Sequence, residues 1–211
     1  MKTVNLNIIE KPARLLPEQQ NSRVGRLPIT QQIKILQNRE IIRAGTYSAG
    51  ELGHTVINFD GLLCHCGRKG CLETYASGAA LIRIISEKSA ENPNWPGARA
   101  GQDITAAADL ICQLAESGEA LSLDILKTMF RYLCVGIDTI MSLYAPDIVT
   151  IDGIFNRAAP LLQETIKKHC LHSRLSETEI RISPYDQKTA AIGASLLAAS
   201  RICNPVHYLL K

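Results

Sequence analysis

The chain has 211 residues, of which 46% are hydrophobic and 20% are charged, and its formal net charge is +3. This composition is typical of a globular protein with a sizeable buried core, and the length corresponds to one domain or two small ones. It excludes a membrane-spanning protein, because no uninterrupted apolar run approaches the roughly 20 residues that a spanning helix needs.

The N-terminal stretch is basic and irregular. Residues 1–43 contain eight lysines or arginines and three glutamates, a net charge of +5, and the prolines Pro12, Pro17 and Pro28. A basic arm of this kind can approach nucleic acid, but we favour a solvated or poorly ordered face. The prolines interrupt the stretch too often for the three packed helices of a DNA-reading head. It also lacks the apolar core and cleavage site of a secretory signal, which favours a cytoplasmic protein. We expect residues 1–32 to be a divergent, weakly ordered segment, in which residues 4–9 are compatible with a short strand.

From Ile33 the pattern becomes regular. Two short apolar runs, IKIL and EIIRA, flank a polar triplet whose Asn38 suits a turn, so residues 33–44 predict a β-hairpin. Residues 45–53 are rich in glycine and other small residues, which favours close approach of the backbone to a ligand. A strand is predicted next, over residues 54–59.

Residues 50–77 hold the densest chemistry of the chain. Three of the seven cysteines lie there in a C-x-C-x4-C arrangement, which suits a metal better than disulfides in a reducing compartment. Together with one histidine they supply the ligands of a closed tetrahedral zinc site: His54, Cys64, Cys66 and Cys71. His65 is the rival fourth ligand. A side chain adjacent to two bound cysteines tends to point away from the same metal, so we favour His54.

The remainder of the chain alternates helices with strands. Apolar spacing predicts helices over residues 74–89, 105–116, 119–144, 158–170 and 190–199, and Asp103 suits the cap of the second. Short β-branched runs predict strands over residues 148–151 and 179–183, and loops are expected over residues 92–103 and 152–156. This order predicts an α/β layer architecture. The stripe of apolar residues in 119–144 is typical of core packing.

Three motifs around the cysteines closely resemble the signature of the ROK family, which comprises sugar-responsive repressors and sugar kinases. They are G-E-L-G-H at 50–54, C-x-C-G-x-x-G-C at 64–71 and C-L-E-T-x-A-S at 71–77. The resemblance implies the C-terminal half of an actin-like ATPase (ribonuclease H-like) fold with a zinc-stabilised loop, and a sugar-binding and oligomerisation domain over residues 33–211. It places zinc on the four residues named above and sugar contacts on Glu51, His54 and Glu73.

The sequence also departs from the kinase members that it resembles. It has no Asp-x-Gly-x-Thr phosphate loop, no Asn-Asp pair with a base aspartate, and no glycine-rich run before the hairpin. After the strand at 148–151, Asp152-Gly153-Ile154-Phe155 stands where kinases carry three glycines, and we expect the bulky side chains to hinder phosphate binding. Phosphoryl transfer needs a positioned base and a phosphate cradle, so no catalytic residue is assigned.

The resulting hypothesis is a non-catalytic, zinc-containing sugar-sensing module of a ROK-type transcriptional regulator, truncated so that the DNA-binding head is missing. The alternative is a partial sugar kinase of the glucokinase or fructokinase type, which transfers phosphate from ATP to a hexose with loops supplied by a partner chain. A structural or protein-binding zinc module is the third possibility. The expected partners are a sugar or sugar phosphate effector and further copies of the chain in a homo-oligomer. DNA is expected only if a head is supplied elsewhere, and no membrane contact is expected.

Overall fold

A five-stranded sheet and a layer of helices form the fold. The computed structural model describes residues 2–8, 32–37, 40–41, 50–170, 177–183 and 195. Within these residues the strands lie in the order β3-β2-β1-β4-β5, and β1 is antiparallel to β2 but parallel to β4. Their bounds are β1 Lys2–Ile8, β2 Gln32–Gln37, β3 Glu40–Ile41, β4 Ile148–Gly153 and β5 Glu179–Ile182. The predicted α/β architecture is therefore present.

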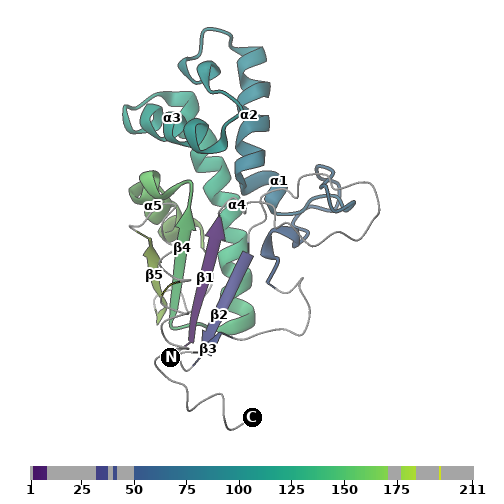
Figure 1. The fold of residues 1–211 in the computed structure, drawn as a ribbon, viewed down its shortest axis with the longest axis vertical. Coiled ribbons are helices and arrows are strands. Elements are labelled where there is room, and N and C mark those ends of the chain that lie inside the picture. Colours follow the sequence, from purple (N-terminus) through teal and green to yellow (C-terminus); the bar gives the residue numbers. More distant parts are fainter. Residues whose placement is uncertain are drawn as a thin grey trace.

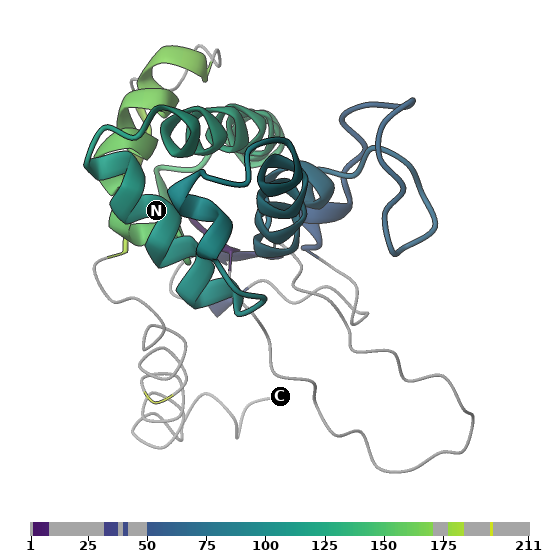
Figure 2. The same ribbon diagram turned by 90° about the horizontal axis from the view of Figure 1, so that it is seen from above.

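The helices occupy one side of the sheet and extend beyond its end (Figure 1). The α-helices are α1 Glu73–Ala76, α2 Gly78–Glu91, α3 Ile104–Glu116, α4 Ala120–Tyr144 and α5 Ala159–His169, and the short 3-10 helices are η1 Leu52–His54, η2 Pro96–Arg99 and η3 Asn156–Ala158. The long helix α4 runs behind the sheet and packs against α5 and α3, and α2 in turn packs against α3. The cysteine-containing loop before α1 projects away from the helices (Figure 2).

The strand β1 lies in the middle of the sheet. Val4 is fully buried and pairs in register with Val149 of β4, which is also fully buried. The sequence predicted a short strand at residues 4–9 inside a segment that we expected to be weakly ordered, and residues 2–8 form that strand as part of the sheet. Residues 9–31 lie outside the described residues.

The predicted hairpin is confirmed. Strands β2 and β3 are antiparallel, with Leu36 opposite Ile41 and Gln37 opposite Glu40. The intervening turn, residues 38–39, lies outside the described residues. The predicted strand at 179–183 is present as β5, which pairs in parallel with β4. The predicted helix at 190–199 lies outside the described residues except for Ser195, which is helical.

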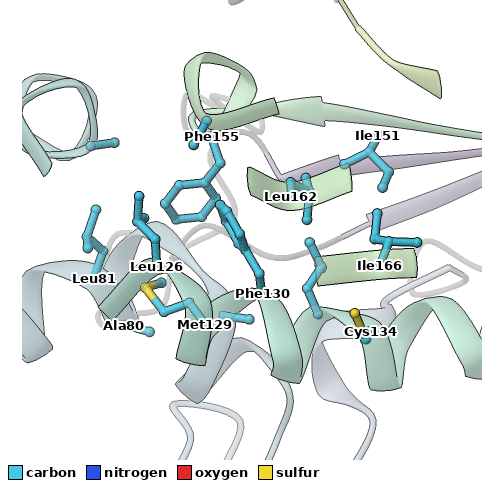
Figure 3. Close-up of a cluster of buried hydrophobic side chains, with 14 of the residues drawn as sticks. Ala80, Leu81, Leu126, Met129, Phe130, Cys134, Ile151, Phe155, Leu162 and Ile166 are labelled. Carbon is cyan, nitrogen blue, oxygen red and sulfur yellow. The ribbon is translucent and has the colours of Figure 1, made fainter. Parts of the chain in front are cut away.

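One continuous hydrophobic core joins the sheet to the helices. Phe130 of α4 is 1% exposed and packs edge-on against Phe155, with ring centroids 5.5 Å apart. Figure 3 shows these rings between the α2–α4 contact on one side and Leu162 of α5 on the other. The apolar stripe predicted in residues 119–144 is thus core, as its spacing indicated. Within the described residues, none of the helices combines the length and apolar character needed to cross a membrane.

Two predicted elements differ from the structure. The strand predicted over residues 54–59 is wrong, because His54 ends a 3-10 helix and only Val56 forms an isolated bridge, with Cys71. The helix predicted over 74–89 is divided at Ser77, whose backbone is extended and whose side chain accepts a hydrogen bond from the Ala80 N–H at 3.1 Å. Ser77 therefore caps the start of α2 and ends α1.

Glu119 caps the start of α4 with its carboxylate. It accepts hydrogen bonds from the backbone N–H groups of Leu121 at 3.0 Å and Ser122 at 2.8 Å, and from the indole N–H of Trp95 at 2.8 Å. Partial burial acts to raise the pKa of the Glu119 carboxyl, but donation by Ser122, Trp95 and Leu121 outweighs it and lowers the pKa to about 2. The folded state therefore favours the ionised form of the Glu119 carboxyl, and ionisation of this group stabilises the fold.

Removing this charge is expected to change the acid sensitivity of the protein. Because the folded-state pKa of Glu119 lies below the ordinary value of 4.5, its stabilising contribution is fully present above pH 4.5 and is lost as the pH falls toward about 2. Glu119→Gln should lower the free energy of unfolding at pH 7 and flatten its decline between pH 4.5 and 2. Urea unfolding across this range tests it, with Glu164→Gln on the exposed side of α5 as the control. If the free energy of unfolding of Glu119→Gln fell as steeply between pH 4.5 and 2 as that of the unsubstituted protein, the prediction would be contradicted.

Candidate functional site

The cysteine loop is folded back on itself by two short antiparallel contacts. At its base, the Leu72 N–H donates to Thr55 O at 2.9 Å and the Ile57 N–H donates to Gly70 O at 2.8 Å. At its tip, Leu63 and Lys69 form a second bridge. These contacts bring the two ends of the loop together, so His54 and Cys71 become neighbours although they are 17 positions apart in the chain.

Gly70 is required by the close approach of the two sides of this loop. Its φ is +71°, and a Cβ at this position would stand 1.5 Å from the carbonyl oxygen of Asn58. Any larger residue would push the sides apart and shift the adjacent Cys71. The glycine before the last cysteine of the C-x-C-G-x-x-G-C motif thus has a steric role here.

The four predicted metal ligands converge. The ligand atoms of His54, Cys64, Cys66 and Cys71 all lie within 4.8 Å of one another. The Sγ atoms of Cys66 and Cys71 are 3.6 Å apart, and the Sγ of Cys64 is 3.6 Å from Nδ1 of His54. With Zn–S near 2.3 Å and Zn–N near 2.0–2.1 Å, a tetrahedral site has S–S edges of about 3.8 Å and S–N edges of about 3.6 Å. The donor set and its spacing therefore fit a tetrahedral zinc ion.

The three thiols differ in their readiness to lose a proton. Burial raises the pKa of the Cys71 thiol, and burial together with a hydrogen bond to Glu73 raises that of Cys64. Cys66 is exposed, and donation from the Arg68 backbone N–H lowers the pKa of its thiol to about 7. A metal that binds all three must displace the two buried protons, so we expect its affinity to rise with pH.

The three residues expected to contact sugar also lie together. His54 Nε2 is 3.8 Å from Glu51 Oε2, and His54 Nδ1 is 3.5 Å from Glu73 Oε1. Glu73 is only 5% exposed, and among the described residues its Oε2 has no hydrogen-bond partner. If Nδ1 of His54 faces the metal, Nε2 is left toward Glu51. The imidazole then stands between the metal ligands and Glu51, whereas Glu73 lies on the same side of the ring as Cys64.

His65 takes a different position from the one considered in the sequence. Its Nδ1 lies 2.7 Å from Glu73 Oε1, and it forms a second possible metal-binding group with His54 and Glu73. Of the two histidines, His54 groups with the three cysteines. No signal in the sequence pointed to the contact between His65 and Glu73, beyond the place of His65 between two cysteines.

The stretch after β4 turns its large side chains into the protein. Phe155 is 3% exposed and belongs to the core, and Asp152 is 2% exposed and accepts a hydrogen bond from the Asn156 amide at 3.0 Å. The Gly153 N–H donates to the Asn156 side chain at 3.1 Å. Phe155 is therefore held in the core, away from the loop surface where we expected it to hinder phosphate binding.

Comparison with known proteins relates the chain to regulators and to enzymes. The ROK family sequence model matches residues 33–201. The DNA-binding transcriptional repressor Mlc of Escherichia coli is 25% identical over 167 residues, which cover 77% of this chain and 40% of the repressor. A glucokinase of Halalkalibacterium halodurans is 29% identical over 176 residues, which cover 77% of this chain and 51% of the enzyme. The chain thus spans about half the length of these relatives.

Solved structures show the same fold. A ROK family glucokinase from Streptomyces griseus, in complex with glucose and AMPPNP, matches with a TM-score of 0.71 at 19% identity, and the match covers 93% of this chain and 60% of that chain. This likeness confirms the actin-like ATPase fold that the sequence motifs implied. Since the family model covers well over half of its residues, the chain belongs to the ROK family.

Proposed function

We propose that this chain is a non-catalytic, zinc-containing sugar-sensing module of a ROK-type transcriptional regulator. The observation that carries the proposal is the convergence of Glu51, His54 and Glu73 beside a four-ligand cluster with tetrahedral spacing. A buried carboxylate oxygen without a partner is costly, and a sugar hydroxyl is a donor that would satisfy it. The similarity to the Mlc repressor supports a regulatory role.

In this proposal zinc acts as a structural ion. His54 and the three cysteines would hold it and keep the two sides of the loop together, because the loop buries little apolar surface of its own. Phe59 and Leu63 of the loop are 87% and 71% exposed, so hydrophobic burial contributes little to its order. Zinc would thereby fix the orientation of His54. It would also fix Glu73, which follows the ligand Cys71 by two positions, so that both side chains are held in place for a ligand.

The second candidate function is sugar phosphorylation, and the glucokinase relative favours it. The sequence of this chain shows neither the phosphate loop nor the Asn-Asp pair that its kinase relatives are expected to carry. Incubation of the zinc-loaded chain with ATP and glucose separates the two candidates. A sensing module should form no glucose 6-phosphate, whereas its formation at a rate above that of a Glu73→Gln variant would favour the kinase.

Replacing Glu73 tests the proposed sugar contact. Glu73→Gln should weaken binding of a recognised sugar by about tenfold to a hundredfold, since a hydrogen bond to a charged group contributes about 1.5–3 kcal/mol. Zinc should remain at one ion per chain, because Glu73 is not among the four proposed ligands. Calorimetry against glucose, N-acetylglucosamine and its 6-phosphate measures binding, and elemental analysis measures zinc. Glu164→Gln on α5 is the control. Unchanged sugar binding in Glu73→Gln would favour a purely structural zinc module.

A further inference from the structure

A groove of about 260 Å³ lies along the contact between α4 and α5. The two helices are neighbours in the helical layer (Figure 1), and the thiol of Cys134 on α4 donates to the carbonyl oxygen of Thr165 on α5 at 3.8 Å. The groove is smaller than the roughly 300–1,000 Å³ of pockets that hold drug-sized ligands, so it suits a smaller molecule. Among the lining side chains are the cations Lys127, Arg131 and Lys168, the carboxylates of Asp124 and Glu164, and the hydroxyl of Thr128.

The three cations of the groove are not neutralised by ion pairs. Lys127, Arg131 and Lys168 are exposed, and none of them belongs to an ion pair among the described residues. Arg131 also lacks the hydrogen bond that each of the other arginines with a described side chain makes: Arg68, Arg83, Arg99, Arg157 and Arg181. Its guanidinium therefore keeps its N–H donors available for a ligand.

The placement of these cations favours the binding of an anion. Lys127 and Arg131 are four positions apart on α4, so they project from the same face of the helix, and like charges at this spacing destabilise a helix. Lys168 brings a third positive charge to the same groove from α5. An anion bound between the two helices would offset the repulsion among the three side chains.

The types of donor in the groove indicate a phosphate group. A guanidinium binds phosphate through two parallel N–H donors, and a lysine ammonium adds a flexible point charge. The Thr128 hydroxyl can donate a further hydrogen bond. The carboxylates of Asp124 and Glu164 accept hydrogen bonds and repel negative charge, so the remainder of the ligand has to carry donors such as hydroxyl groups.

From these observations we propose that the groove between α4 and α5 binds a small phosphomonoester whose organic part carries hydroxyl groups. The phosphate contacts Lys127, Arg131 and Lys168, and the hydroxyl groups donate to the two carboxylates of the wall. A strand of nucleic acid is disfavoured, because its successive phosphates would face those carboxylates.

This site is separate from the proposed sugar-contacting trio and from the four proposed metal ligands, since none of those residues lines the groove. The inference therefore goes beyond the proposed function and does not rest on it. Glu164 belongs to the groove alone, so Glu164→Gln should leave the binding of an uncharged sugar by the trio unchanged.

Matched ligands test the chemistry of the groove. The zinc-loaded chain is titrated by calorimetry at low ionic strength, in a buffer without phosphate, with glycerol 3-phosphate, propyl phosphate, glycerol and a short DNA duplex. Glycerol 3-phosphate should bind about threefold or more tightly than propyl phosphate, because its hydroxyl groups can donate to the carboxylates, and glycerol should not bind. Absence of glycerol 3-phosphate binding would overturn the inference, as would tighter binding of a duplex that depends on Arg131. Equal binding of propyl phosphate would overturn the role of the carboxylates.

Substitution of Arg131 tests where the phosphate binds. Arg131→Gln should weaken the binding of glycerol 3-phosphate by about tenfold or more, since hydrogen bonds between charged groups are the stronger ones. Arg157→Gln is the matched control, because it removes the same charge from an exposed arginine that does not line the groove. Equal weakening in both variants would show that net charge alone governs binding and would overturn the site. Glu73→Gln should bind glycerol 3-phosphate as the unsubstituted protein does, so a failure of the sugar-sensing proposal is distinguishable from a failure of this one.

Amide NMR signals locate the ligand directly. When glycerol 3-phosphate is added to the zinc-loaded protein, the signals of Thr128 and Thr165 should shift, whereas those of residues 52–71 should stay in place. Shifts confined to any other part of the chain would overturn the inference.

Discussion

Cys71→Ala is expected to lower the zinc content of the purified protein from one ion per chain to none. Cys71 is fully buried, and its Sγ lies 3.6 Å from that of Cys66. A structural zinc ion contributes on the order of 10 kcal/mol to the folding of small zinc domains, so removing one of four ligands should release the loop between residues 52 and 71. Elemental analysis gives the stoichiometry.

Proteolysis reports the release of the loop directly. Arg68 and Lys69 stand at its tip and are exposed, so trypsin should cleave there much faster in Cys71→Ala, and faster in the unsubstituted protein after treatment with a zinc chelator. Cys112→Ala is the matched control, because Cys112 is equally buried but lies on α3, away from the cluster. Cys112→Ala should keep one zinc ion per chain, and trypsin should cleave it as slowly as the unsubstituted protein. One zinc per chain in Cys71→Ala would instead assign the ion to the group of His54, His65 and Glu73.

Local signals in the sequence predicted most of the helical layer. Asp103 accepts a hydrogen bond from the Ala106 N–H at 2.7 Å, as expected for the cap of α3. The end of α3 was marked by Ser117 and Gly118, and Gly118 has a φ of +86° that glycine adopts without strain. Each of these features depends on residues within four positions of one another, which is why the sequence is sufficient to predict them.

Features that depend on distant residues were not predictable in the same way. β1 takes its place beside β4 through the pairing of Val4 with Val149, and no local pattern specifies that partner. The segment from Val56 to Phe59 resembles a strand in its residue types, but only Val56 forms a bridge, and its partner Cys71 is 15 positions away in the chain. The three cysteines of the cluster were foreseen because their spacing is local, and His54, ten positions before Cys64, was foreseen from its ligand type and its motif. The contact between His65 and Glu73 was not, since it depends on how the loop folds back.

Phe130→Ala is expected to cause the largest loss of stability in the helical layer. The side chain is 1% exposed at the centre of the core in Figure 3, and its removal should lower the free energy of unfolding by about 3–5 kcal/mol through lost burial and the cavity that remains. This is a large part of the 5–15 kcal/mol that typically stabilises a domain, so Phe130→Leu provides a second variant with a smaller volume change. Urea unfolding measures both variants. Leu143→Ala on the same helix is the control, because Leu143 is 68% exposed and should change stability little.

The effect of Phe130→Ala should be separable from the metal site. Helix α4 reaches the site at Gly136, where an added Cβ would lie 2.7 Å from Leu72 and 3.2 Å from Leu52, the residues next to Glu73 and Glu51 in the chain. Gly136 is six residues from Phe130, or about 9 Å along the helix axis. Folded Phe130→Leu should therefore unfold at lower urea while keeping one zinc per chain and its sugar affinity. A parallel loss of zinc would show that the core beneath Phe130 and the loop form one cooperative unit.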